Sequence, residues 1–147
     1  MATEVDRILG KLKFIEKYLQ KLEDLKIDDL EEYLKDETKN DLSRLYLQLI
    51  YQSAIDINQH ILTEDFGLEI KEYSDTFIKM GVYGVIDNYL SNSLKESAKM
   101  RNVLVHLYDK IDYSILFDSV GETIVEYPLY VEQIFSYING LKVNNNG

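Results

Sequence analysis

The chain has 147 residues and no cysteine, and 26 acidic against 16 basic side chains give it a formal net charge of −10. The lack of cysteine excludes disulfide bonds and thiolate metal sites, and the excess of carboxylates argues against non-specific coating of nucleic acid, whose phosphates it would repel. One proline, seven glycines and 46% hydrophobic residues favour an all-α domain of long helices over an architecture of strands and turns.

The hydropathy of the chain and the residues at its amino end predict where the protein is located and how its domain is organised. No apolar run approaches the roughly 20 residues that a membrane-spanning helix needs. The acidic start lacks the basic residues and apolar core of a signal peptide, so we expect a cytoplasmic protein with no membrane partner. We find no internal repeat and no linker. We therefore expect one domain over residues 1–142, an antiparallel bundle of about five helices, and a frayed tail over residues 143–147.

Three helices are expected in the first half of the chain. Apolar residues recur at steps of three and four from residue 5 to residue 22, which predicts one long amphipathic helix. The acidic stretch that follows can hold a short helix over residues 29–35. A second long helix is expected over residues 39–62, and its buried stripe would consist of Leu42, Leu45, Leu49, Ile50, Ile57 and Ile61.

The second half of the chain predicts helices that are harder to delimit. A short helix is expected around residues 74–80, and helical periodicity then extends over residues 85–107, either as one helix or as two that meet near Lys99. Asp112 is suited to cap a further helix that continues through residue 117. Pro128 is expected to start the last helix, which would end at residue 141, because proline is favoured in the first turn.

Four polar residues near the end of the periodic stretch are candidates for chemistry. The chain has only two histidines, and histidine is the side chain best suited to move protons near neutral pH. On a helix that advances by 100° per residue, one arc of about 160° would contain Arg101, Asn102, His106 and Tyr108. The opposite side of that helix would be anchored by Val103, Leu104 and Leu107.

This set of residues suits cleavage of RNA without a metal ion. Attack of a 2′-hydroxyl on the adjacent phosphorus needs a base, an acid and positive charge; His106 can act as base or acid, and Arg101 can hold the phosphate oxygens. Asn102 can orient the imidazole or bind a phosphate oxygen, and Tyr108 can stack on a base or donate a hydrogen bond. The same residues are also consistent with a solvated surface or a dimer contact.

The other histidine, His60, has Asp56 and Glu64 four residues away on either side. A metal site built from these three residues is conceivable. A histidine near a helix end, in favourable carboxylate surroundings, is the simpler interpretation.

The segment from Arg101 through Asn102 and His106 to Tyr108 resembles the signature of the HEPN superfamily, and the tyrosine two residues after the histidine resembles the HepT form in particular. The likeness extends over roughly residues 12–137. It includes an Ile-Asp-Ile stretch at residues 55–57 and a segment at residues 73–77 that leads into the motif helix. Met100 departs from the pattern, because the family often has glycine or an aromatic residue there.

The resemblance implies a homodimeric toxin of a toxin–antitoxin pair that acts as a metal-independent RNase, with no cofactor and with its two motifs facing each other across the dimer cleft. It implies that Arg101 and His106 are catalytic and that Asn102 assists. It also implies an antitoxin of the MNT nucleotidyltransferase type, which neutralises the toxin by adding AMP to Tyr108. A bulky anion at that position would block RNA and neutralise the local positive charge.

A second hypothesis is a non-catalytic helical binding subunit that presents substrate to a nucleotidyltransferase or regulates it. The complete set of Arg101, His106 and Tyr108 favours the enzyme. The acidic net charge favours the binding subunit.

Overall fold

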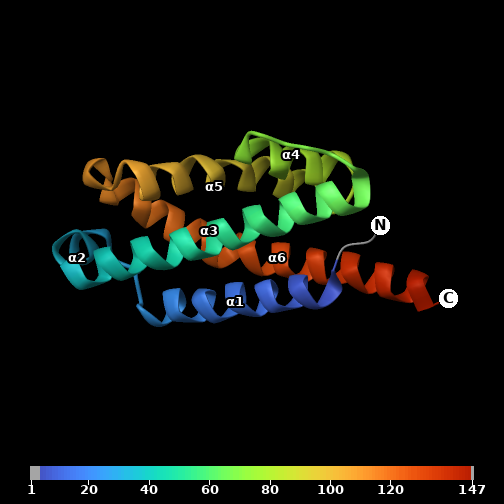
Figure 1. Ribbon diagram of the computed structural model, residues 1–147. Coiled ribbons are helices and arrows are strands. Elements are labelled where there is room, and N and C mark those ends of the chain that lie inside the picture. The colour runs from blue at the N-terminus through green and yellow to red at the C-terminus, as the bar shows by residue number, and fades with distance from the viewer. Residues whose placement is uncertain (1–3, 147) are drawn as a thin grey trace.

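Six α-helices and one short 3₁₀ turn make up the protein in the computed structural model, which describes residues 4–146 and the side chains of residues 4–140 (Figure 1). The helices are α1 (Val5–Asp24), α2 (Leu30–Lys35), α3 (Glu37–Phe66), α4 (Tyr73–Val82), α5 (Asn88–His106) and α6 (Tyr113–Asn146), and the turn η1 (Tyr108–Lys110) lies between α5 and α6. The predicted all-α class is confirmed, with six helices over the described residues instead of about five.

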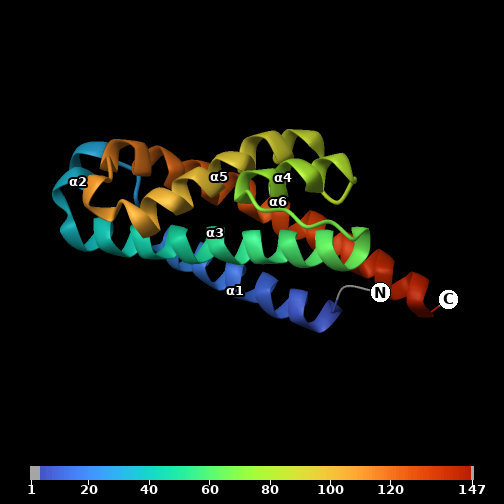
Figure 2. The same cartoon turned by 45° about the horizontal axis from the view of Figure 1, so that its top comes forward.

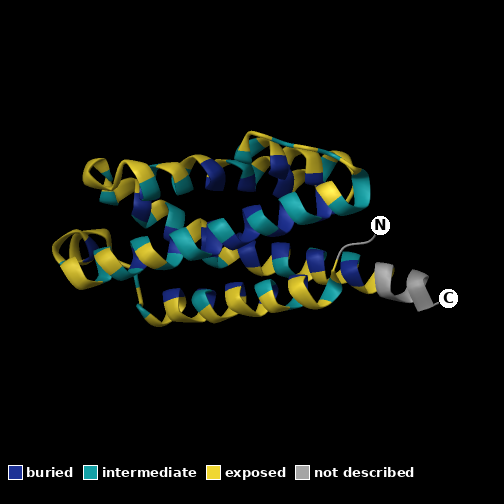
Figure 3. Ribbon diagram, viewed as in Figure 1, coloured by how far each residue is buried: buried dark blue, intermediate teal, exposed yellow. Residues whose placement is uncertain are grey.

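Three long helices, α1, α3 and α6, lie side by side and give the bundle its elongated shape (Figures 1 and 2). The shorter helices α4 and α5 pack on each other beside α3, and α5 runs toward the end of the molecule that carries α2 (Figure 2). Buried residues line the inner faces of all the long helices (Figure 3). Over the described part of the chain, no helix has both the length and the apolar character that crossing a bilayer would require.

The first helix follows its predicted pattern closely. Its apolar stripe is buried against α3 and α6 and consists of Ile8, Leu12, Ile15, Leu19 and Leu22. The short helix α2 is capped by Asp29, whose side chain accepts a hydrogen bond from the backbone N–H of Glu31 at 3.0 Å. Both helices therefore form where local sequence favours them.

Helices α4 and α5 approach each other closely at Gly81. A Cβ atom placed on this glycine would lie 2.5 Å from the Cβ of Ser91, so no other residue fits there without a shift of the backbone. The Ser91 hydroxyl donates a hydrogen bond to the carbonyl oxygen of Phe77 at 2.9 Å. This contact sets the position of α5 relative to α4. Helix α5 runs without a break from Asn88 to His106, so the alternative of two helices that meet near Lys99 is wrong.

The prediction that Pro128 starts a helix is wrong, because α6 runs unbroken from Tyr113 to Asn146 with the proline inside it. Proline removes one backbone hydrogen bond from a helix, and tertiary packing around it outweighs that loss. Its neighbours Tyr127 and Tyr130 are buried and their rings pack together in the core, whereas the proline faces solvent. Asp112 caps the start of α6 as predicted, by accepting a hydrogen bond from Ser114 N–H at 2.9 Å.

A buried hydrogen-bond network joins α3, α4 and α6. The Tyr130 hydroxyl donates to the backbone oxygen of Ala54 at 3.1 Å and lies 2.6 Å from the Asn58 side-chain oxygen. The Asn58 amide donates to the Thr76 hydroxyl at 3.2 Å. Burial raises the pKa of Tyr130 well above its ordinary value, so the phenol stays protonated. The network fixes α3 against α4 and α6.

Candidate functional site

The candidate motif lies at the carboxyl end of α5, but the helix stops earlier than the sequence pattern predicted. Its last residue is His106, and Leu107 leaves helical geometry with φ −126° and ψ 35°. The predicted single arc is therefore wrong at its end, because Tyr108 begins the η1 turn instead of continuing the helix. Leu107, expected as an apolar anchor, is 46% exposed for the same reason, whereas Leu104 is buried as predicted.

The side chain of Arg101 is held in place by contacts with three other side chains. Its guanidinium Nε donates to the side-chain oxygen of Gln52 on α3 at 2.6 Å, and Nη1 donates to the side-chain oxygen of Asn102 at 3.0 Å. The guanidinium centre also lies 5.1 Å from the centre of the Tyr73 ring on α4, within the range of a cation–π contact. Contacts to three helices thus fix the cation while its remaining N–H groups stay available to an anion.

A second layer of contacts holds Gln52 in turn. The Gln52 amide donates to Asp56 Oδ1 at 2.9 Å, and Asp56 Oδ2 lies 3.6 Å from the ammonium of Lys11 on α1. We refer to Gln52, Asp56, Lys11 and Tyr73 as the Arg101 support. Sequence reasoning singled out none of them for this role. The one available signal was the i, i+4 spacing of Gln52 and Asp56, which places both side chains on one face of α3.

His106 and Asn102 are both exposed at the open end of the motif. The structure joins Asn102 to Arg101 by the hydrogen bond given above, and among the described residues no hydrogen bond joins Asn102 to His106. Of the two roles expected for Asn102, the geometry fits contact with a phosphate held by Arg101 better than orientation of the imidazole. The imidazole of His106 is accessible to a ligand and lies on the same last turns of α5 as the guanidinium.

Tyr108 is 62% exposed, and its ring faces α3. The guanidinium centre of Arg44 lies 5.9 Å from the ring centre. Beside this pair is a hollow of about 310 Å³, which we call the Tyr108 hollow, lined by Arg44, Leu45, Gln48, Leu104, Val105 and Tyr108. The prediction that Leu45 is buried is wrong: it is 45% exposed because it borders this hollow instead of facing the core.

Among the described residues, His60 makes a structural hydrogen bond and does not lie in a cluster of metal ligands. Its Nε2 atom accepts a hydrogen bond from the backbone N–H of Glu4 at 3.1 Å, which ties the start of α1 to α3. Asp56, its expected partner, is instead engaged by Gln52 and Lys11. Within the described residues, no group of three histidine or carboxylate side chains could hold a metal ion.

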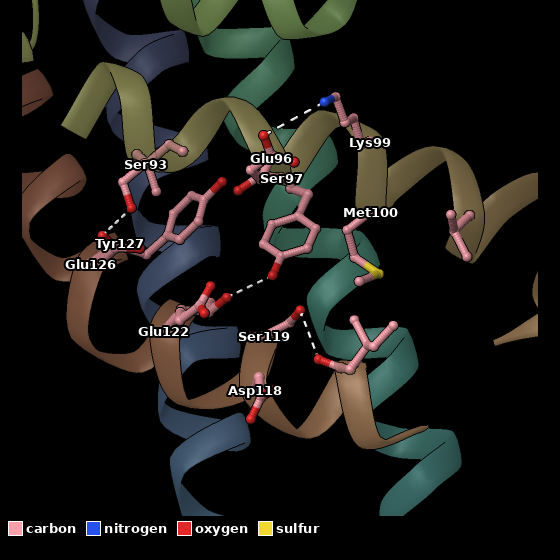
Figure 4. A pocket seen from close by; sticks show the side chains of 15 residues that line it. Ser93, Glu96, Ser97, Lys99, Met100, Asp118, Ser119, Glu122, Glu126 and Tyr127 are labelled. Carbon is pink, nitrogen blue, oxygen red and sulfur yellow. Dashed lines mark hydrogen bonds and ion pairs between the residues drawn. The ribbon is translucent and has the colours of Figure 1, made fainter. Parts of the chain in front are cut away.

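A second hollow, of about 350 Å³, lies between α5 and α6 (Figure 4). We call it the acidic hollow, because the carboxylates that line it are Glu96, Asp118, Glu122 and Glu126. Burial raises the pKa of Glu122, and the charges of Glu126 and Asp118 raise it further. Lys99 forms an ion pair with Glu96 at 3.6 Å, which leaves the excess negative charge in place. This hollow is unsuited to a phosphate.

Comparisons with known proteins give the family of the chain. The family described as "Ribonuclease HepT-like" matches residues 15–134. A protein named "tRNA nuclease HepT" from Aphanizomenon flos-aquae is 35% identical over 136 residues, which cover 92% of each chain. A protein named "mRNA nuclease HepT" from Shewanella oneidensis is 26% identical over 130 residues, which cover 88% of this chain and 96% of the relative.

Solved structures show the same fold. A tri-AMPylated HEPN toxin from Shewanella oneidensis, solved in complex with an MNT antitoxin, aligns with a TM-score of 0.79 at 22% identity, over 90% of this chain and 98% of that one. The cytosolic protein YutE from Bacillus subtilis, of unknown function, aligns with a TM-score of 0.83 at 17% identity, over 95% and 94% of the two chains.

Proposed function

Because the chain belongs to the HepT-like ribonuclease family, we propose that it is the toxin of a toxin–antitoxin pair and that it cleaves RNA with Arg101 and His106. The observation that carries this proposal is the fixed guanidinium of Arg101, held by α3 and α4 at the helix end that also exposes His106. A fixed cation and an accessible imidazole at the same helix end can bind a ribose phosphate and carry out one of the two proton transfers that its cleavage requires.

The proposed reaction is metal-independent. The 2′-oxygen of one nucleotide forms a bond to the adjacent phosphorus, the bond from that phosphorus to the 5′-oxygen breaks, and a cyclic phosphate and a free 5′-hydroxyl result. One proton leaves the 2′-oxygen and another reaches the 5′-oxygen, while Arg101 stabilises the negative charge on the phosphate. Asn102, which the guanidinium contacts, would bind a phosphate oxygen.

The two proton transfers give a reason for a homodimer. They occur on opposite sides of the phosphorus, and one imidazole cannot serve both positions at once. A second copy would supply the other His106, and the two motifs would share one cleft. Two copies of Arg101 in that cleft would also create a local cationic focus on a chain of net charge −10.

Incubation of the purified protein with RNA in EDTA tests the nuclease. We expect cleavage by the wild type and a loss of at least about a hundredfold in His106→Ala, because general acid–base catalysis contributes that much. His60→Ala is the matched control, since the hydrogen bond of this histidine among the described residues is with the backbone of Glu4, away from the motif. Equal activity in the two variants, or activity that EDTA abolishes, would contradict the proposal.

We also infer that an MNT-type nucleotidyltransferase neutralises the toxin by adding AMP to Tyr108. The support is the exposure of this tyrosine two residues after His106, where an attached nucleotide would cover the motif. Co-expression with the cognate transferase should add adenylyl groups to the peptide that contains Tyr108, and mass spectrometry should find none in Tyr108→Phe. Tyr89→Phe is the control, because Tyr89 is similarly exposed at 68%. Modification that persists in Tyr108→Phe would place the acceptor elsewhere.

The second candidate function is a non-catalytic subunit that partners a nucleotidyltransferase, and the net charge of −10 is the observation in its favour. Expression of the chain alone separates the two functions. Growth arrest that disappears in His106→Ala and Arg101→Ala supports the nuclease, whereas harmless expression of the wild type supports the subunit.

A further inference from the structure

Arg44 is a cation without an assigned task in the proposed reaction. It lies on α3, is partly buried, and forms no ion pair with any described carboxylate, although acidic residues outnumber basic ones in this chain. Its one contact of note is with the ring of Tyr108, at 5.9 Å from guanidinium centre to ring centre. An unpaired guanidinium with planar, forked donors is well suited to bind the oxygens of a phosphate.

The Tyr108 hollow supplies the other surfaces that a nucleotide would need. Leu45, Leu104 and Val105 offer apolar walls for a flat base, and the Gln48 amide can donate and accept hydrogen bonds at the edge of that base. The hollow measures about 310 Å³. That volume lies near the lower end of about 300–1,000 Å³ for pockets that hold small ligands.

We propose that Arg44 and the Tyr108 hollow form a nucleotide subsite, which holds the adenylyl group after its attachment to Tyr108. This inference rests on the proposed modification. In that reaction the phenol oxygen forms a bond to the α-phosphorus of ATP, the bond from that phosphorus to its bridging oxygen breaks, pyrophosphate leaves, and the transferase accepts the phenol proton. The product is a phosphodiester with one negative charge, next to Arg44.

The subsite changes how neutralisation works. A nucleotide that hangs freely from Tyr108 would block the motif only part of the time and would be open to phosphodiesterases. A nucleotide whose phosphate is bound by Arg44 and whose base lies against Leu45 would remain beside His106 and resist removal. The acceptor tyrosine and the residues that retain the product would then belong to the same chain, and the transferase could dissociate.

The experiment measures how fast a phosphodiesterase removes AMP from the modified protein, by intact mass. Arg44→Met should release AMP about tenfold faster than the wild type, because a hydrogen bond to a charged group contributes about 1.5–3 kcal/mol. Arg44→Lys should fall between the two, since it keeps the charge and loses the fork. Arg7→Met, the same substitution at an exposed arginine on α1, is the control and should match the wild type. Equal release rates in all four proteins would overturn the subsite.

Two further measurements separate this inference from its premise. Free AMP titrated into the unmodified chain and followed by NMR should bind at least about fivefold more weakly to Arg44→Met than to Arg7→Met. This arm tests the subsite even when the transferase does not modify Tyr108, and equal affinities overturn it. Weaker RNA binding by Arg44→Met, with unchanged AMP release, would assign the hollow to the RNA phosphate and overturn its role in modification. Circular dichroism and thermal unfolding confirm that each variant is folded.

Discussion

The two sides of α5 differ in how their charges are compensated. On the side toward α3 and α4, Arg101 is held by Gln52, Asn102 and Tyr73, so a cation is fixed in place. On the side toward α6, burial together with the charges of Glu126 and Asp118 raises the pKa of Glu122 in the acidic hollow. Helix α5 therefore carries an ordered cation on one side, and on its other side it faces the mutually repelling carboxylates of Asp118, Glu122 and Glu126 on α6.

This difference teaches where an anion can bind to an acidic protein. A net charge of −10 describes the field far from the molecule, and binding depends on the field within a few ångströms. The acidic hollow repels phosphate from one side of α5 and leaves the end of the helix near Arg101 as the favoured approach. The acidic composition thus restricts RNA binding to one place without excluding it.

The largest effect is expected from removal of the fixed cation. Arg101→Ala should lower RNA cleavage at least about a hundredfold, because it removes both phosphate binding and charge stabilisation. Arg101→Lys should recover only part of the activity, since an ammonium cannot replace the planar fork that contacts Gln52 and the substrate together. Cleavage assays with a defined oligonucleotide measure both variants. Full activity in Arg101→Lys would show that the geometry of the cation does not matter.

An intermediate effect is expected from the Arg101 support. Gln52→Leu removes the acceptor of the guanidinium Nε–H at nearly constant volume, so we expect about a tenfold loss of kcat/KM and weaker RNA binding. Gln59→Leu is the matched control, because Gln59 lies two turns further along α3 and is likewise partly buried. Since Gln52 acts through Arg101, the loss should largely vanish in an Arg101→Ala background. Additive losses in the double variant would remove Gln52 from the support.

The smallest effect is expected in the acidic hollow. A carboxyl group whose pKa is raised on folding destabilises the folded protein when it is ionised, and this penalty disappears as the pH falls through the folded-state pKa. Glu122→Gln should therefore stabilise the protein at pH 7.5 by about 0.5 kcal/mol or less, because solvent screens this mostly open site. The gain should disappear near pH 4, and RNA cleavage should stay unchanged.

Urea denaturation at the two pH values measures this gain in stability. Glu132→Gln on the exposed face of the same helix is the control and should change nothing at either pH. A stabilisation that persists at low pH would come from packing instead of charge.

Much of the fold could be predicted because it depends on local pattern. The periodicity of α1, the short helix near residues 29–35 and the cap at Asp112 follow from neighbouring residues, and the structure confirms them. The prediction failed at Pro128, where a general rule about proline conflicts with the burial of Tyr127 and Tyr130. The helix continues through Pro128 because of tertiary packing, and such packing cannot be read from the neighbouring residues in the sequence.

The sequence motif proposes the residues of the candidate site, and it does not give their geometry. The motif located Arg101 and His106, but helical continuation placed Tyr108 on the wrong element, because the end of α5 depends on the turn into α6. Gln52 supports Arg101 from 49 positions away in the chain. Arg44 contacts Tyr108 from the same distant helix. Such contacts arise only once α3 and α5 pack together.

The ion pair between Lys11 and Asp56 connects helix α1 to the hydrogen bonds that hold Arg101. Helix α1 carries none of the motif, yet it secures the carboxylate that secures Gln52. Loss of the Lys11 ammonium alone would therefore leave every motif residue and the apolar stripe of α1 intact and still loosen the carboxylate that orders Gln52.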